Sequence, residues 1–220
     1  VDNHSFNLLG RKDSYNSVAP IAELTYRPMG YNGPILTIDY ERGIRKFMGS
    51  DTDYERVEID GQYKHHLSAL SYLQLRAGTG FYTHKGFGSY FLDYSNFREN
   101  NIPGGWNDDW ACSFELLNSN GMHFELLNSQ WYNASKYYVR ANAAYETPLL
   151  LLSWLPIAGR LIERERIYIN ALSVKRLNPY IEYGYGFSTR ALSLGWFVAQ
   201  RNWRFDGMGV RVNMELFRHW

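Results

Sequence analysis

The chain has one cysteine and no long hydrophobic run. Cys112, alone among 220 residues, cannot form an internal disulfide. No stretch of about 18 consecutive apolar residues is present, which excludes a transmembrane helix. The net charge at pH 7 is only +1 and the sequence has no basic stripe, so nothing supports a nucleic-acid partner.

The sequence also lacks a catalytic or metal-binding constellation. None of the six histidines forms a pair at the i, i+4 spacing of a zinc protease. A barrel enzyme that cleaves lipids needs a serine and a histidine projecting together at one membrane interface, and nothing fixes Ser68 or Ser71 in register with His65. We therefore predict no catalytic, cofactor-binding or metal-binding residues, no cofactor and no enzymatic activity.

What the chain does have is strict alternation of apolar and polar residues. In the closing segment, one parity holds Val210, Val212, Met214 and Leu216, and the other holds Arg211, Asn213 and Glu215. Successive side chains of a strand lie on opposite faces, so this pattern predicts a strand with one apolar and one charged face. Residues 56–64, 73–81, 137–145 and 180–187 repeat the pattern.

Segment length and aromatic content favour a membrane barrel over a soluble sandwich with its charged face in water. Residues 54–65, 70–82, 136–146 and 208–217 reach the roughly 9–11 residues of a membrane strand, against about 5–6 for a soluble one. Aromatic residues make up 17% of the chain and cluster near strand ends, as in an interfacial girdle. A mean hydropathy of −0.42 fits a chain in which only alternate residues face lipid. The predicted interface aromatics are Trp110, Trp154, Trp203 and Trp220.

The fold class predicted is all-β, a transmembrane antiparallel up-and-down β-barrel of about 12 strands, with 10 or 14 as alternatives. The expected strands are 3–9, 19–27, 35–42, 53–65, 70–82, 89–96, 108–118, 136–146, 165–174, 179–187, 191–199 and 207–218. Residues 1–220 then form a single barrel domain. Because the chain begins at Val1 without a methionine or an export signal, we expect it to be the C-terminal part of a longer chain.

Connection lengths suggest an orientation. The tight turns 66–69 and 188–190 are expected in the periplasm, and the longer loops 43–52, 83–88, 119–135 and 200–206 outside the cell. Residues 97–107 form a long periplasmic connection in this scheme. An even strand count places both chain ends in the periplasm.

Two connections have unusual sequences. Residues 147–162 are strongly apolar but interrupted by prolines, which predicts a short helix or loop at the membrane interface or in the barrel mouth. Phe-Glu-Leu-Leu-Asn-Ser at 114–119 recurs at 124–129, with Asn120-Gly121 between the copies. That dipeptide favours a hairpin, but an added strand would make the count odd, so we favour a lengthened extracellular loop.

The charged parity predicts a polar lumen. The expected lumen-facing charged residues are Asp39, Glu41, Arg56, Glu58, Asp60, Arg76, Arg140, Glu182, Arg211 and Glu215. Both signs occur in similar numbers, whereas a selective pore more often shows one dominant sign. A network of ion pairs across the lumen is the simpler interpretation.

Several motifs are typical of one known family. They are Leu36-Thr-Ile-Asp-Tyr-Glu-Arg-Gly43, Asp51-Thr-Asp-Tyr-Glu-Arg56, Gly80-Phe-Tyr-Thr83, Asp93-Tyr-Ser-Asn-Phe-Arg98, Pro103-Gly-Gly-Trp-Asn-Asp108, Tyr137-Tyr-Val-Arg-Ala-Asn142, Leu150-Leu-Leu-Ser-Trp-Leu-Pro156, Phe205-Asp-Gly207 and Glu215-Leu-Phe-Arg218. With them, the chain from about Ile21 onward resembles the C-terminal outer-membrane barrel of a Bacteroidetes family of undefined function, whose members carry an N-terminal carboxypeptidase-regulatory-like domain. The resemblance implies an envelope barrel and no catalytic residues.

These inferences lead to a functional expectation. The leading hypothesis is an outer-membrane barrel with a structural, anchoring or transport-associated role. Its expected partners are the lipid bilayer, the barrel assembly machinery during insertion and other envelope proteins. The alternatives are an assembly factor for outer-membrane proteins, a lipid-acting barrel enzyme, and a soluble carrier barrel with its apolar residues pointing inward.

Overall fold

A single antiparallel sheet of nine strands makes up most of the computed structural model, which describes residues 2–5, 14–29, 33–86, 124–127, 136–148, 150–152, 155–156, 160–175, 177–190 and 192–214. Its strands are β3 (Ile21–Tyr26), β4 (Ile35–Gly43), β5 (Tyr54–His66), β6 (Tyr72–Lys85), β7 (Tyr137–Thr147), β8 (Arg164–Val174), β9 (Leu177–Ser188), β10 (Leu192–Arg201) and β11 (Arg204–Met214). A separate hairpin pairs β1 (Asp2–Ser5) with β2 (Ser14–Ser17), and Phe47–Gly49 forms one 3-10 turn.

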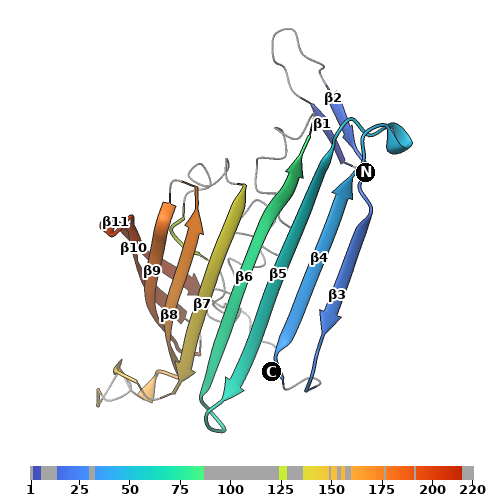
Figure 1. Ribbon diagram of the computed structural model, residues 1–220. Coiled ribbons are helices and arrows are strands. Elements are labelled where there is room, and N and C mark those ends of the chain that lie inside the picture. Colours follow the sequence, from blue (N-terminus) through green and yellow to red (C-terminus); the bar gives the residue numbers. More distant parts are fainter. Residues whose placement is uncertain are drawn as a thin grey trace.

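In the large sheet, strands pair only with their neighbours in the chain, in the unbroken order β3 to β11, so the topology is an up-and-down meander (Figure 1). The alternation in the sequence explains the register. Val57, Ile59 and Gly61 all lie on one face, and Arg56, Glu58 and Asp60 all lie on the other. A shift of one residue would exchange these faces, so the pattern fixes the pairing.

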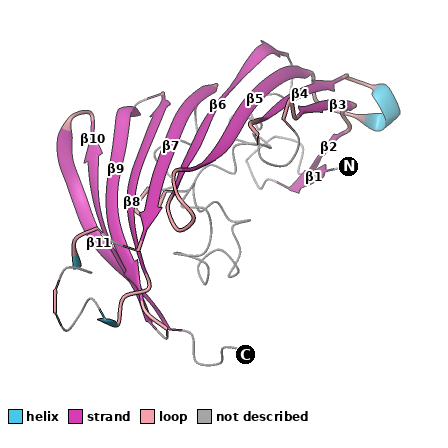
Figure 2. Ribbon diagram, turned by 90° about the horizontal axis from the view of Figure 1, so that it is seen from below, coloured by secondary structure: helices cyan, strands magenta, loops and turns pink. Residues whose placement is uncertain are grey.

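The sheet bends strongly from strand to strand and forms a trough with one concave and one convex face (Figure 2). Its three register shifts fall at Glu55/Arg56, Leu172/Val174 and Ala199/Gln200. All three lie near the end where β5 begins and where β8 and β10 end (Figure 1). Bulges of this kind increase local twist and bend strands at sheet rims.

The predicted all-β, antiparallel, up-and-down architecture is confirmed, and nine of the twelve expected strands match those of the sheet. The expected strands 89–96 and 108–118 lie outside the described residues. The strand expected at 3–9 is a correction: β1 pairs with β2 in its own two-stranded sheet and does not join the nine. Across the described strands, the sheet order runs from β3 to β11 without a pairing between these two.

The longer loop predicted at residues 200–206 is wrong, whereas the tight turns predicted at 66–69 and 188–190 and the longer loop at 43–52 agree with the strand ends. Asn202 and Trp203, with φ of 51° and 64°, form a two-residue turn between β10 and β11 where residues 200–206 were expected to form a longer loop. Two residues also separate β8 from β9, at the same end of the sheet as the turn between β10 and β11. Three residues separate β9 from β10 at the opposite end. Two positive φ values match the primed turns whose twist suits a tight hairpin.

Residues 147–162 have no α-helix among their described positions, which form bends and single helical turns. Pro148 directly follows the end of β7. A proline has no N–H group, but at this position the sheet needs no further hydrogen bond from the chain. More generally, none of the helical segments in the described ranges is both long and apolar enough to cross a membrane.

Candidate functional site

The concave face of the sheet holds most of the buried charge. Arg56, Glu58 and Asp60 on β5 are at most 5% exposed, although each carries an ionisable group. Glu41, opposite Arg56 on the adjacent strand β4, and Arg140, two strands away on β7, are also buried. Buried charges are costly unless they are paired, so the hydrogen-bond partners decide what this face can do.

The first cluster spans β4 and β5. Arg56 Nη2 donates to Glu41 Oε2, and the Tyr54 hydroxyl donates to Glu41 Oε1. Arg56 Nε also lies 3.3 Å from Glu58 Oε1. One guanidinium therefore bridges two carboxylates, which removes much of the cost of burying them.

The second cluster connects β5, β6 and β7. Asp60 receives hydrogen bonds from Arg76 Nε at 3.0 Å and from Arg140 Nη2 at 2.6 Å. Asp60 and Arg140 stand on strands separated by β6, and the residue between them in register is Gly78. A Cβ at Gly78 would lie 2.7 Å from Asp60 Oδ1, so the absent side chain leaves the room for this direct contact.

The third cluster lies at the opposite end of β7. Arg166 Nη2 donates to Glu146 Oε2, and the Tyr72 hydroxyl donates to the same oxygen at 2.5 Å. Arg164 Nη1 reaches the second oxygen of Glu146 at 3.2 Å. Between this cluster and the previous one, Asn142 Nδ2 donates to Asn170 Oδ1 at 2.9 Å. Each cluster joins groups of opposite charge, so this face has no single dominant sign.

A short segment of the connection between β6 and β7 docks on the concave face. The backbone N–H groups of Glu125 and Leu126 donate to the two carboxylate oxygens of Glu182, each at 2.9 Å. The Tyr180 hydroxyl donates to Glu182 at 3.1 Å, and the Phe124 ring packs edge-on against the Tyr180 ring, with centroids 5.8 Å apart. Residues 124–127 belong to the second copy of the six-residue repeat, and they are not a strand.

The convex face has the reverse composition. Large apolar side chains are exposed there on strands across the whole sheet: Leu24, Leu36, Leu75, Phe81, Val139, Ile167, Ile169, Tyr183, Trp196, Val198, Met208, Val210 and Val212. Ile169, at the middle of β8, is 48% exposed, and Val212 near the end of β11 is 61% exposed. Contiguous apolar surface of this extent marks a face that meets lipid or another apolar partner.

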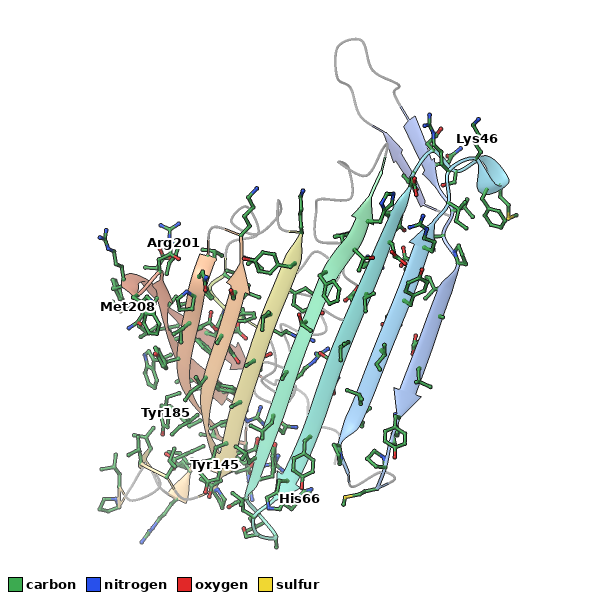
Figure 3. All side chains as sticks on the ribbon, in the orientation of Figure 1. Lys46, His66, Tyr145, Tyr185, Arg201 and Met208 are labelled. Carbon is green, nitrogen blue, oxygen red and sulfur yellow. The ribbon has the colours of Figure 1, made fainter. Side chains whose placement is uncertain are left out.

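One carboxylate interrupts the apolar convex face. Glu165 shares the parity of Ile167 and Ile169, yet it is fully buried. Its oxygens accept hydrogen bonds from the backbone N–H groups of residues 150–152, at 2.6–3.2 Å. The Tyr185 hydroxyl donates to Glu165 at 2.5 Å, and Figure 3 shows Tyr185 beside the connection that follows β7. The segment expected at the membrane interface is thus anchored on the convex face.

The structure places the predicted lumen residues as follows. Asp39, Glu41, Arg56, Glu58, Asp60, Arg140 and Glu182 are buried on the concave face. The Arg76 side chain is 18% exposed there, and Arg211, half exposed, lies 3.3 Å from Glu125. Glu215 lies outside the described residues. Sequence reasoning missed Glu146, Arg166 and Glu165; the alternation of Arg166, Tyr168 and Asn170 with Ile167 and Ile169 carries the signal for Arg166.

The predicted interface tryptophans are mostly beyond what the structure describes. Trp110, Trp154 and Trp220 lie outside the described residues. Trp203 occupies the turn between β10 and β11 and is highly exposed. Trp196, absent from that prediction, is exposed on the convex face and stacks on Tyr185 at 6.4 Å between centroids.

The serines and histidines near the turn after β5 have local contacts. Ser68 Oγ accepts the backbone N–H groups of Leu70 and Ser71, and Ser71 Oγ donates to Thr147. His65 Nδ1 lies 3.0 Å from the Tyr63 hydroxyl. Within the described ranges, no three His, Cys, Asp or Glu side chains gather as metal ligands would.

Comparison with known families identifies the chain. Residues 26–187 match the model of the C-terminal domain of a family of unknown function, DUF5686. The chain belongs to this family. The match runs from the end of β3 to near the end of β9 and so includes all three charged clusters and the Glu182 and Glu165 sites. No curated protein matches the chain.

Proposed function

We propose that this DUF5686 domain is an outer-membrane β-barrel with a structural, anchoring or transport-associated role. The observation that carries the proposal is the reversed polarity of its two faces. Charged groups such as Glu58 and Asp60 are buried on the concave face, while Ile169 and Val210 are exposed on the convex face. A soluble barrel buries apolar side chains inside, whereas a membrane barrel turns them to lipid and keeps a polar interior.

The proposal includes closure into a barrel of about twelve strands. Each unpaired N–H or C=O in lipid costs several kcal/mol, so only a closed sheet is stable there. Seven consecutive strands, β5 to β11, have 10–14 residues each, the length that crosses a bilayer when tilted. The curvature in Figure 2 and the register shifts near one rim support closure.

The interior argues for a structural or anchoring role over an open pore. The three clusters tie opposite charges together across β4 to β8, and residues 124–127 occupy part of the concave face. The family resemblance adds an upstream carboxypeptidase-regulatory-like domain in a Bacteroidetes envelope protein, which the barrel would hold at the membrane. The bilayer, the barrel assembly machinery and other envelope proteins are the proposed partners. Roles as an assembly factor or lipid-acting enzyme stay alternative predictions.

A charge placed on the convex face tests the proposal. In lipid, Ile169→Arg at mid-sheet should cost about 2–4 kcal/mol of folding free energy, as an arginine does at the bilayer midplane. In water, the same exposed position should tolerate arginine within about 0.5 kcal/mol. Leu67→Arg, at a similarly exposed turn residue at the sheet end, is the matched control, because the penalty falls toward zero near the interface.

The measurement is urea unfolding of the full chain folded into phospholipid vesicles, with membrane fractionation of cells that express each variant. Equal stability of the two variants would contradict the membrane assignment. Lipid contact is measured separately through Trp196, retained as the only tryptophan in a variant protein. Brominated acyl chains should quench its fluorescence, and an unquenched Trp196 would indicate that the apolar face meets a protein partner.

A further inference from the structure

The Glu182 site holds a four-residue segment whose sequence occurs twice in the chain. Phe124-Glu-Leu-Leu127 is seated on the concave face, and the identical Phe114-Glu-Leu-Leu117 stands ten residues earlier. We propose that Glu182 and its surroundings form a binding site for a Phe-Glu-Leu-Leu segment, and that the upstream copy competes for it. The connection between β6 and β7 then docks in two registers, ten residues apart.

The site has a polar anchor that does not depend on which copy is bound. Glu182 is fully buried, and its two oxygens accept two consecutive backbone N–H groups. Backbone groups are the same in both copies. The carboxylate therefore holds whichever segment is seated and does not itself distinguish the two copies.

Side-chain contacts supply the selectivity. Phe124 packs in a buried cluster with Tyr138, Leu172 and Tyr180. Leu126 contacts a second cluster of Ala144, Tyr168 and Phe197, and a Cβ at Gly209 would lie 2.5 Å from its Cδ2 atom. Arg211 donates to the Glu125 carbonyl at 3.0 Å and pairs with its carboxylate at 3.3 Å. Phe114, Glu115 and Leu116 present the same groups in the same order.

The tether allows both registers. Seating the upstream copy leaves 28 residues between Lys85 and Phe114 and 19 between Leu117 and Tyr137. An extended chain spans roughly 3.3–3.6 Å per residue, so neither side is too short to reach across the sheet. Loop-closure entropy changes only slowly with loop length, so it contributes little to the free-energy difference between the two registers.

Disulfide trapping in the full chain tests the proposal, with Cys112 replaced by serine. Gly209→Cys is combined with Leu126→Cys for the seated register and with Leu116→Cys for the upstream register. Asn120→Cys with Gly209→Cys, outside both copies, reports random collision. We expect cross-links in both motif pairs well above the Asn120 pair under mild oxidation. A Leu116 yield no higher than the Asn120 yield would overturn the proposal.

Substitution of one copy should move the balance. Phe124→Ala should raise the yield of the Leu116 cross-link several-fold and lower the yield of the Leu126 cross-link. Phe114→Ala should abolish the Leu116 cross-link and leave the Leu126 cross-link unchanged. Glu182→Gln should lower both, because an amide presents only one acceptor oxygen to the two N–H groups. An unchanged Leu116 yield in Phe124→Ala would count against competition. The readout needs only a folded sheet, so it is independent of whether the convex face meets lipid.

Discussion

Replacing Glu165 with glutamine tests how the connection after β7 is held against the convex face. The Glu165 oxygens accept the backbone N–H groups of residues 150–152 at 2.6–3.2 Å, and the Tyr185 hydroxyl at 2.5 Å. A glutamine side chain has one oxygen and one NH₂ group. In either orientation, the NH₂ group faces at least one backbone N–H group. Because both groups are donors, that N–H is left without its hydrogen bond.

The structure sets the size of the effect. With the amide nitrogen at the Oε2 position, the Leu150 N–H loses its acceptor and Leu151 keeps only its longer contact, at 3.2 Å. A hydrogen bond to a charged group contributes about 1.5–3 kcal/mol, and a buried donor left unmatched costs a similar amount. We expect the docked state of the segment to lose about 3 kcal/mol, which raises its opened fraction roughly a hundredfold.

Trypsin cleavage after Arg160 measures this opening, because Arg160 lies within the segment and cleavage requires a locally opened chain. When closing is faster than cleavage, the rate follows the opened population. Glu163→Gln is the matched control: Glu163 is 40% exposed and lies 3.5 Å from Arg190, a surface pair worth about 1 kcal/mol at most. Equal cleavage rates in the two variants would refute the anchoring argument.

Three further predictions concern the charged interior and the topology. Asp60→Asn should destabilise the folded protein by about 3–5 kcal/mol in urea unfolding, because two arginines lose their shared buried carboxylate; a loss below 1 kcal/mol would contradict this. Gly78→Ala should cost about 1–3 kcal/mol through overpacking against Asp60, whereas Gly207→Ala, with no atom within 4 Å of its Cβ, should change little. With Cys112 replaced, Met48→Cys should react with a membrane-impermeant maleimide on intact cells, and Leu151→Cys only after the outer membrane is permeabilised; the opposite order would invert the topology.

The strands of the sheet were predictable because their two faces differ in polarity. Residues 136–146 were expected as a strand and form β7 at Tyr137–Thr147; residues 165–174 form β8 at Arg164–Val174. Such segments repeat apolar and polar residues over five or more positions. Their period identifies both the strand and the face that each side chain takes.

The hairpin and the last turn were not predictable from this signal. β2 is four polar or aromatic residues, Ser-Tyr-Asn-Ser, and has no apolar face to reveal it. The turn at Asn202–Trp203 places a tryptophan at positive φ, which few bulky residues adopt. Asn-Trp is not a recognised hairpin dipeptide, so the sequence indicated a longer loop.

The parity of the charges predicted which face they occupy, but it did not predict their partners. Asp60 and Arg140 meet because each lies beside Gly78 in register, and this depends on two pairings across residues 60–140. Glu165 does not follow the rule that charged residues share the polar parity of a strand. It shares a face with isoleucines and is buried only because a connection folds back over it.

Glycines in the middle of strands explain how long side chains from the strands on either side meet on the concave face. Gly80 stands between Glu58 and Tyr138, whose hydroxyl reaches Glu58 at 3.2 Å, just as Gly78 stands between Asp60 and Arg140. On β9, Gly184 separates Tyr168 from Phe197, whose rings lie 5.9 Å apart. In each row, the missing side chain lets two long neighbours meet over the strand between them. A concave face built this way is covered by cross-strand contacts. In the barrel that we propose, passage of a solute along this face would require breaking buried ion pairs, and this supports the proposed structural role over a pore.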